Sequence, residues 1–158
     1  MTDRERLPRQ HPDTDADPAA DGLTLDLRRR LRILADTLPA LEAPDFEPGR
    51  WHKSEQRDDG VWTMPWYELG PTALAFTRAV GQTGFMRTDF AWPDWASTPE
   101  SIDLRTDREA LAHATPDQLA KLLTMLIRED RFNEGALGYS FETGLIAAIA
   151  RRAKALAG

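Results

Sequence analysis

The sequence predicts a mainly α-helical single domain, a bundle of about five helices with a short extended or hairpin element near residues 60–67. Three observations support this fold class. Leucines recur at helical spacing after residue 24, a well-specified helix start stands at Thr115, and the C-terminal residues are rich in alanine. A chain of 158 residues favours one domain, which buries roughly 70% of the surface that its unfolded chain exposes.

Residues 1–22 are expected to form a disordered N-terminal arm, and residues 23–158 the single helical domain. The arm contains six acidic residues, three arginines and three prolines, and its large apolar side chains are Met1 and Leu7. Such a segment cannot bury enough apolar surface to offset its loss of conformational entropy.

The first helix is expected over residues 24–41, where leucines at spacings of three and four residues form one apolar face. These leucines are Leu27, Leu31, Leu34, Leu38 and Leu41. Pro39 weakens the last turn, because proline cannot donate a backbone hydrogen bond. Residues 42–60 are then expected to form a charged loop, and the aromatic stretch 61–69 an edge strand or an extended segment over the core.

A second helix is expected over residues 71–81, because proline is well suited to the first helical position. The stretch FAWPDW, residues 90–95, is expected to be irregular because Pro93 lies between two tryptophans. A short helix is predicted over residues 107–114.

The best-specified helix follows Thr115. Thr115 is a suitable N-cap, Pro116 fits the first helical position, and Gln118 stands where a capping-box partner belongs. Its apolar face consists of Leu119, Leu122, Leu123, Leu126 and Ile127. The last segment, residues 134–156, contains three glycines, and we expect it to break near residues 143–144 into two shorter helices.

The composition disfavours several classes of function. The formal net charge of −6 argues against nucleic acid and anionic lipid as partners. The absence of cysteine excludes disulfides, thiolate nucleophiles and cysteine-based metal sites, and it is compatible with a reducing compartment. No stretch of about 18 apolar residues is present, so no membrane partner is expected. We therefore expect a cytoplasmic protein.

Motifs of catalysis are also missing from the sequence. His11, His52 and His113 do not have the spacing of a metal site or a catalytic triad, and no phosphate-binding glycine loop is present. We therefore expect no cofactor, no metal and no catalytic residue. A small enzyme is the least favoured alternative, and it would use carboxylates such as Asp89 and Glu134.

An arginine-rich corner follows the helix that starts after Thr115: Arg128-Glu129-Asp130-Arg131-Phe132-Asn133-Glu134-Gly135. Together with residues 90–95 and the sequence FETG of residues 141–144, this corner resembles an uncharacterised bacterial family catalogued as a domain of unknown function. In that family a helix ends in an Arg-x-x-Arg-Phe-x-Glu-Gly turn before a glycine-interrupted C-terminal helix. The resemblance covers residues 31–152 and implies no activity, substrate or catalytic residue.

The corner has a structural interpretation. Arg128 lies in a last helical turn, where a cation complements unsatisfied carbonyls and the negative end of the helix dipole. Arg131 is expected to be partly desolvated and to need a carboxylate partner, so Arg131→Ala should destabilise more than Arg30→Ala. The candidate partners are Asp89, Glu134 and Glu142. Alternatively, the two corner arginines bind a phosphate or carboxylate ligand.

The five tryptophans are Trp51, Trp62, Trp66, Trp92 and Trp95. Large aromatic side chains usually fill a core, but these could also line a ligand or peptide groove, since Trp66 lies beside Tyr67. The candidate ligand-binding residues are therefore Trp66, Tyr67, Asp89, Trp92, Trp95, Arg128, Arg131 and Glu134.

We expect a small binding or regulatory module that contacts a protein or a small molecule. The alternative is a nucleic-acid-associated protein that uses one face of the first helix, although such a charge run is more typical of a solvated helix face. The arginines of that face are Arg28, Arg29, Arg30 and Arg32. A helix–turn–helix interpretation fails, because a recognition helix from Glu134 offers no base-reading side chain before Arg151.

Overall fold

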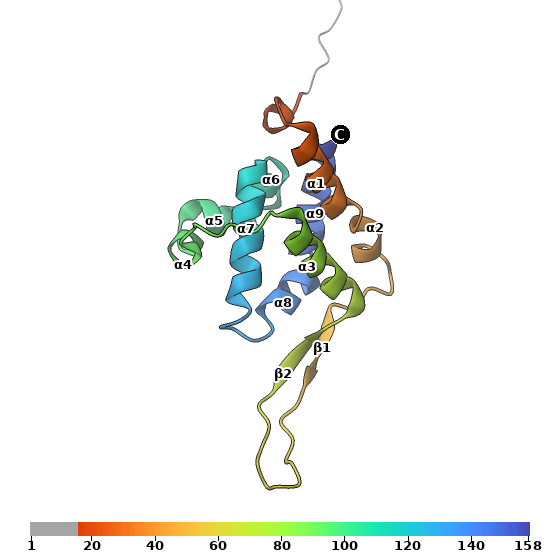
Figure 1. Cartoon of the computed structure of the whole chain (residues 1–158), viewed down its shortest axis with the longest axis vertical. Coiled ribbons are helices and arrows are strands. Elements are labelled where there is room, and N and C mark those ends of the chain that lie inside the picture. The colour runs from red at the N-terminus through yellow and green to blue at the C-terminus, as the bar shows by residue number, and fades with distance from the viewer. Residues whose placement is uncertain (1–15) are drawn as a thin grey trace, which may run out of the picture.

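The C-terminal helix α9 (Leu145–Ala157) is the element against which most others pack in the computed structural model, which describes residues 16–158 (Figure 1). Its most extensive contact is with α1 (Leu25–Ala35). The other elements that contact it are the short 3₁₀ turn η1 (Pro18–Ala20), α2 (Leu38–Leu41), α6 (Arg108–Ala112), α7 (Pro116–Glu129) and α8 (Ala136–Glu142). Ile146, Ile149 and Leu156 on α9 are fully buried. The alanine-rich segment is therefore the centre of the bundle, because small side chains let neighbouring helices approach closely.

The predicted fold class is confirmed: helices predominate, with one small antiparallel hairpin. There are more helices than expected, and they are shorter. The predicted helix of residues 24–41 is two helices, α1 and α2, and the Thr37 hydroxyl donates to the carbonyl oxygen of Leu34 at the break (2.6 Å). Pro39 lies in the first turn of α2, where a missing N–H breaks no hydrogen bond. None of the helices within residues 16–158 has the length and apolar character of a membrane span.

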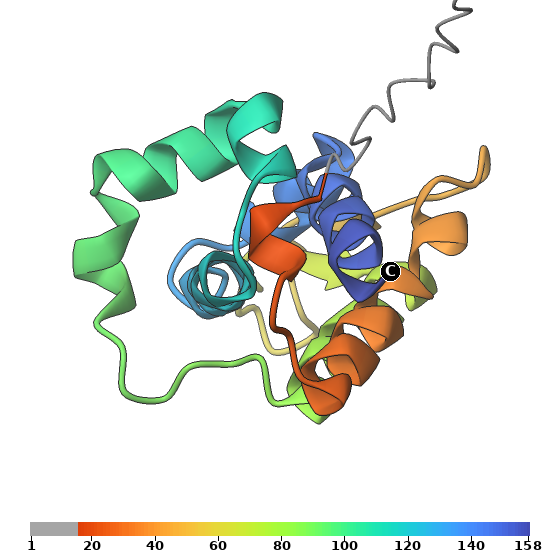
Figure 2. The ribbon, with the colours of Figure 1, turned by 90° about the horizontal axis from the view of Figure 1, so that it is seen from above.

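The sequence predicted that residues 90–95 are irregular, which is wrong for residues 92–95 because they are helical. Pro93 lies in the first turn of α4 (Trp92–Ala96), and α5 (Pro99–Thr106) follows with Thr98 as its N-cap and Pro99 at its start. Helix α5 was not predicted, although Thr98 and Pro99 are the same start signal as Thr115 and Pro116. Figure 2 shows α4 and α5 curving around the outer side of α7.

The hairpin is longer than the predicted element near residues 60–67. Its strands are β1 (Gly49–His52) and β2 (Trp66–Leu69), paired antiparallel with Trp51 opposite Tyr67. Residues 53–65 continue outward and contain one isolated bridge, Gln56 to Trp62. The hairpin projects from the helical body, on the side opposite η1 (Figure 1). Helix α3 (Pro71–Thr83) follows β2 directly and returns the chain to the bundle.

Two helix boundaries near the C-terminus follow the sequence signals. The Thr115 hydroxyl accepts a hydrogen bond from Gln118 N–H, and Gln118 Oε1 accepts one from Thr115 N–H, which completes the predicted capping box. The predicted break at residues 143–144 separates α8 from α9, and Gly144 adopts a φ of 80° there. Only glycine occupies that region readily, so the break is encoded locally.

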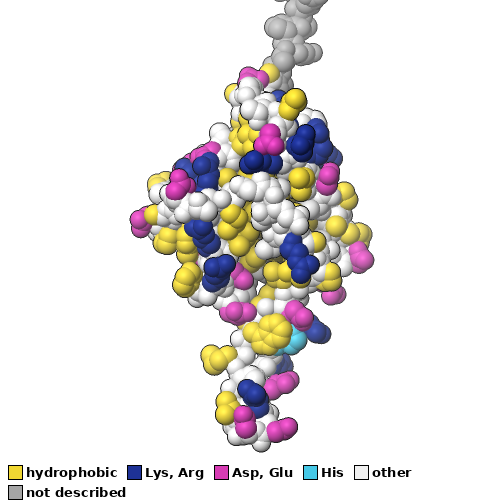
Figure 3. Space-filling view, in the orientation of Figure 1, with side chains coloured by type: hydrophobic (Ala, Val, Ile, Leu, Met, Phe, Trp, Pro, Cys, Tyr) yellow, Lys and Arg dark blue, Asp and Glu magenta, His cyan; other side chains and the backbone are white. Residues whose placement is uncertain are grey.

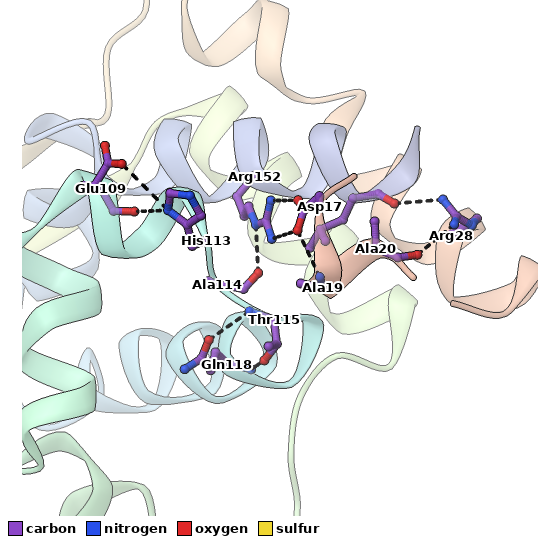
Figure 4. Close-up of polar contacts among 11 residues, drawn as sticks. Asp17, Ala19, Ala20, Arg28, Glu109, His113, Ala114, Thr115, Gln118 and Arg152 are labelled. Carbon is purple, nitrogen blue, oxygen red and sulfur yellow. Dashed lines mark hydrogen bonds and ion pairs between the residues drawn. The ribbon is translucent and has the colours of Figure 1, made fainter. Parts of the chain in front are cut away.

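Residues 16–22 contact the helical domain, and the domain boundary at residue 22 stays a prediction. Asp17 pairs with both terminal nitrogens of Arg152, and Arg152 Nε–H donates to the carbonyl oxygen of Ala114 (2.8 Å) (Figure 4). Arg28 holds the same segment by donating to the carbonyl oxygen of Ala20 (2.9 Å). The sequence could not show that an acidic, proline-rich segment covers a buried arginine. The expectation of disorder for residues 1–15 lies outside the described residues.

Acid is expected to destabilise the protein below about pH 4, and the physical cause is a set of hydrogen-bonded carboxylates. Hydrogen bonds from the Arg152 guanidinium lower the pKa of Asp17 below its ordinary value. Hydrogen bonds from Gln118 and the Trp95 indole lower the pKa of Glu100. Both groups stabilise the fold fully above their unfolded pKa values, and that contribution disappears as the pH falls through their lower folded values. Urea unfolding at a series of pH values measures this dependence. Asp17→Asn should flatten it, and an unchanged slope in that variant would contradict the assignment.

Candidate functional site

Residues 130–135, the corner between α7 and α8, join the hairpin to α4. Glu134 Oε1 accepts a hydrogen bond from the backbone N–H of Tyr67 in β2 (2.7 Å). On the other side, the ring of Phe132 stacks on Trp92 of α4, with centroids 6.1 Å apart. The corner is therefore a junction between two elements that lie far apart in the sequence.

Two glycines allow the hairpin to lie against α8. A Cβ atom on Gly135 would lie 2.4 Å from the Trp51 ring, and one on Gly138 would lie 2.3 Å from the Tyr67 ring. Gly135 also has a φ of 84°, which disfavours any other residue. The two rings meet edge to face, with centroids 5.4 Å apart. The base of the hairpin is thus held by ring-to-backbone contacts that a larger residue would prevent.

Tyr67 titrates abnormally because of this position. Burial raises the pKa of its hydroxyl above the ordinary value, and the negative charges of Glu142 and Asp130 raise it further. The hydroxyl of Tyr67 therefore stays protonated over a wider pH range than that of an ordinary tyrosine, which suits a packing or hydrogen-bonding role.

The expectation that Arg131 is desolvated and paired with a carboxylate is wrong. Arg131 is exposed, and within residues 16–158 its side chain makes no ion pair or hydrogen bond. The corner extends into solvent, as the 81% exposure of Phe132 shows, so a neighbouring guanidinium stays hydrated. Arg128 does hold neighbouring segments together, but its Nη2 donates to the backbone carbonyl oxygen of Arg87 (2.7 Å), not to a carboxylate.

The tryptophans divide between core and surface. Trp95 is buried, and its indole N–H donates to Glu100 Oε2 (3.1 Å). Trp92, the first residue of α4, is half-buried and stacks on Phe132 of the corner. Trp66 is exposed and stacks on His52, with ring centroids 4.1 Å apart and planes 6° apart. The predicted aromatic residues therefore do not converge on one cavity.

Of the predicted ligand-binding residues, Tyr67 and Glu134 contact each other, and Trp92 lies on the neighbouring side of the same corner. Trp66 lies farther out on the hairpin. Asp89 is exposed in the loop between α3 and α4, and within residues 16–158 its side chain makes no hydrogen bond or ion pair.

A groove of about 570 Å³ lies beside the corner, and Glu134 lines it. Its charged side chains come from different elements: Arg105 from α5, Arg108 from α6, Glu129 from the end of α7, and Glu134 from the corner. Leu126 and Leu145 contribute apolar surface. The groove thus combines charged and apolar side chains beside one of the predicted site residues.

The hairpin carries an exposed apolar surface, here called the hairpin surface. It consists of Trp51, Val61, Trp62, Met64 and Trp66, whose exposed fractions run from 47% to 81%. Figure 3 shows such side chains along the projecting hairpin, next to the histidine and charged groups at its base. The Trp66 ring is held by its stack on His52, whose Nε2 lies 2.8 Å from Glu68 Oε2.

Comparison with known proteins places the chain in a family. Residues 27–158 match the family of unknown function DUF6508. The chain belongs to this family. No curated protein and no solved structure matches the chain. The resemblance noted from the corner is thus confirmed at the level of an uncharacterised domain, whereas the bacterial origin and the Arg-x-x-Arg-Phe-x-Glu-Gly pattern stay predictions.

The match places Asp17 before the DUF6508 region, although Asp17 pairs with a buried arginine inside it. The segment of residues 16–22 therefore completes the fold of the family domain in this chain.

Sequence reasoning about this DUF6508 protein missed Arg105, Arg108 and Glu129. Arg105 and Arg108 are three residues apart but fall in two short helices, one of which was not predicted. Glu129 was treated only as part of the corner motif. A cluster of this kind depends on how α5, α6 and α7 pack together, and no local pattern signals it.

Two of the four arginines of α1, Arg28 and Arg32, bind backbone carbonyl oxygens of the C-terminal helix. Arg28 Nη1 donates to the carbonyl oxygen of Leu156 (3.1 Å), and Arg30 pairs with Asp26 (3.0 Å). These contacts support the solvated or structural interpretation of this face and do not favour the nucleic-acid alternative. Among residues 16–158, no cluster of three His, Cys, Asp or Glu side chains is arranged to hold a metal ion.

Proposed function

We propose that this DUF6508 protein is a cytoplasmic binding module that acts through protein contacts, with the hairpin surface as its partner-binding element. One observation carries this proposal: five large apolar side chains are exposed on an element that projects from the folded body, with Trp51 and Trp66 on opposite faces of its two strands. Exposed apolar patches of this kind usually mark interaction sites. The cysteine-free sequence is compatible with a reducing compartment.

The hairpin surface has the composition of an interface centre. Tryptophan and methionine are enriched at protein interfaces, and tryptophan is frequent among the residues that contribute most to binding. The stack of Trp66 on His52 restricts the indole before any partner arrives. An ordered side chain loses less entropy on binding, so it contributes more to affinity.

The corner supports this role by fixing the hairpin's direction. Glu134 accepts a hydrogen bond from the backbone of β2 at Tyr67. The Trp51 ring packs on Gly135 of the corner, and the Tyr67 ring packs on Gly138 of α8. A two-stranded hairpin is marginally stable alone, so this anchoring at its base keeps the outer residues presented.

Replacing Trp62 and Met64 together with alanine is expected to weaken partner binding at least about tenfold, the loss typical of removing an interface residue worth more than about 1.4 kcal/mol. A partner is first isolated from the native host and purified, and its affinity is then measured by calorimetry with wild-type and variant proteins. The matched control replaces two exposed apolar residues of the helical body, Ile33 and Ile102, with alanine. Equal affinities for the hairpin and control variants would refute the proposal.

A further inference from the structure

The groove beside the corner contains four charged side chains that do not neutralise one another. Arg105 donates to the carbonyl oxygens of Ser101 (3.2 Å) and Ala96 (2.7 Å). Arg108 donates to the carbonyl oxygens of Arg105 (3.3 Å) and Thr143 (3.2 Å). Within the described part of the chain, neither guanidinium pairs with a carboxylate.

Within residues 16–158, the negative charges of the two groove glutamates are also not paired with a cationic side chain. Glu134 uses Oε1 to accept the Tyr67 N–H and makes no ion pair among residues 16–158. Glu129 is half-buried at the end of α7, and its carboxylate has no hydrogen-bond or ion-pair partner in the same residues. Opposite charges on neighbouring elements usually pair when they are within reach. Here, backbone contacts fix Arg105, Arg108 and Glu134 separately.

We propose that this groove binds a small zwitterion, an α-amino acid or a compound with the same carboxylate and ammonium groups. The carboxylate binds Arg105 and Arg108, whose guanidinium groups keep N–H donors that the backbone contacts do not use. The ammonium binds Glu129 and the second oxygen of Glu134. The volume of about 570 Å³ is that of a small-molecule site, and Asn133 and Tyr139 supply polar groups at its rim.

The mixed charge of the groove decides the ligand class. A simple anion would be repelled by the two glutamates, and a simple cation would be repelled by the two arginines. A zwitterion satisfies both pairs, and Leu126 and Leu145 then offer apolar surface to its side chain. No residue of the hairpin surface lines the groove, although Gly135 of the lining contacts Trp51, and this inference does not depend on the hairpin's proposed role.

The test measures binding of the common L-amino acids, one at a time at millimolar concentration, to the full chain by saturation-transfer NMR and calorimetry. At least one should bind, and its N-acetyl derivative and its carboxamide should each bind about tenfold more weakly, because each lacks one charged group. No binding by any amino acid, or equal binding of the derivatives, would overturn the proposal.

Glu129→Gln is the decisive variant, because within residues 16–158 the Glu129 side chain makes no hydrogen bond or ion pair and glutamine has nearly the same shape. It should weaken amino-acid binding about tenfold without changing the urea midpoint. Glu109→Gln on the neighbouring α6 lies outside the groove and should bind as the wild type does. Replacement of Trp62 and Met64 should also leave amino-acid binding unchanged, so the two proposals fail separately.

Discussion

Arg152→Ala is expected to lower the free energy of unfolding by about 3 kcal/mol, the low end of the range for breaking a buried ion pair by removing one partner. The Arg152 side chain is only 4% exposed. It joins three segments, because its guanidinium binds Asp17 before α1 and the Ala114 carbonyl before α7, while its own backbone lies in α9. Its removal leaves a buried carbonyl without a donor and a cavity in the centre of the bundle.

Two arginines serve as controls for this prediction. Arg151, the next residue, is exposed and pairs with Glu42 (2.5 Å), and exposed pairs contribute about 0–1 kcal/mol. Arg131 is exposed without a partner in the described residues, so Arg131→Ala should change stability by less than about 0.5 kcal/mol. Urea unfolding of the three alanine variants compares them directly. A similar cost for Arg152 and Arg151 would show that the buried contacts do not stabilise the fold.

Gly138→Ala is expected to destabilise the protein by about 2 kcal/mol, although alanine normally favours a helix over glycine. The added methyl group would lie 2.3 Å from the Tyr67 ring, so the ring and the base of the hairpin must move away. Near-ultraviolet circular dichroism should report the change, because Trp51 and Tyr67 lose their edge-to-face contact.

Gly81→Ala is the matched control for this clash. Gly81 also lies within a helix, α3, and a Cβ atom there meets nothing within 4 Å, so alanine should stabilise by about 1 kcal/mol. Combining Gly138→Ala with Tyr67→Ala removes the ring that the methyl group meets. The double variant should then lose less stability than the sum of the single changes, and strict additivity would show that the two sites do not touch.

The sequence predicted the elements whose signals are local. The capping box at Thr115 and Gln118 uses residues three positions apart, and the break at Gly144 needs only a residue that tolerates positive φ. Such features depend on backbone geometry within one turn, so they are visible in the sequence. Thr98 and Pro99 carry the same helix start signal as Thr115 and Pro116. Helix α5 was not predicted from it, because Pro93 a few residues earlier is typical of an irregular segment.

The candidate site was predicted only in part. Tyr67 and Glu134 do meet, but nothing in the sequence showed that they would do so across 67 positions. The sequence predicted that Arg131 is the desolvated arginine, because it neighbours an aromatic side chain in the corner. It is Arg152 instead, since α9 is the central helix and its arginine lies beneath η1.

The sequence by itself determined a mainly helical fold, the leucine-rich and alanine-rich faces that bury it, and the helix starts and breaks set by threonine, proline and glycine. The tertiary structure alone decided which charges are buried, how far the hairpin projects and which side chains share the groove. The physical reason is that helical periodicity and caps arise from neighbouring residues. Desolvation, by contrast, depends on the elements that pack over a side chain, and these come from anywhere in the chain.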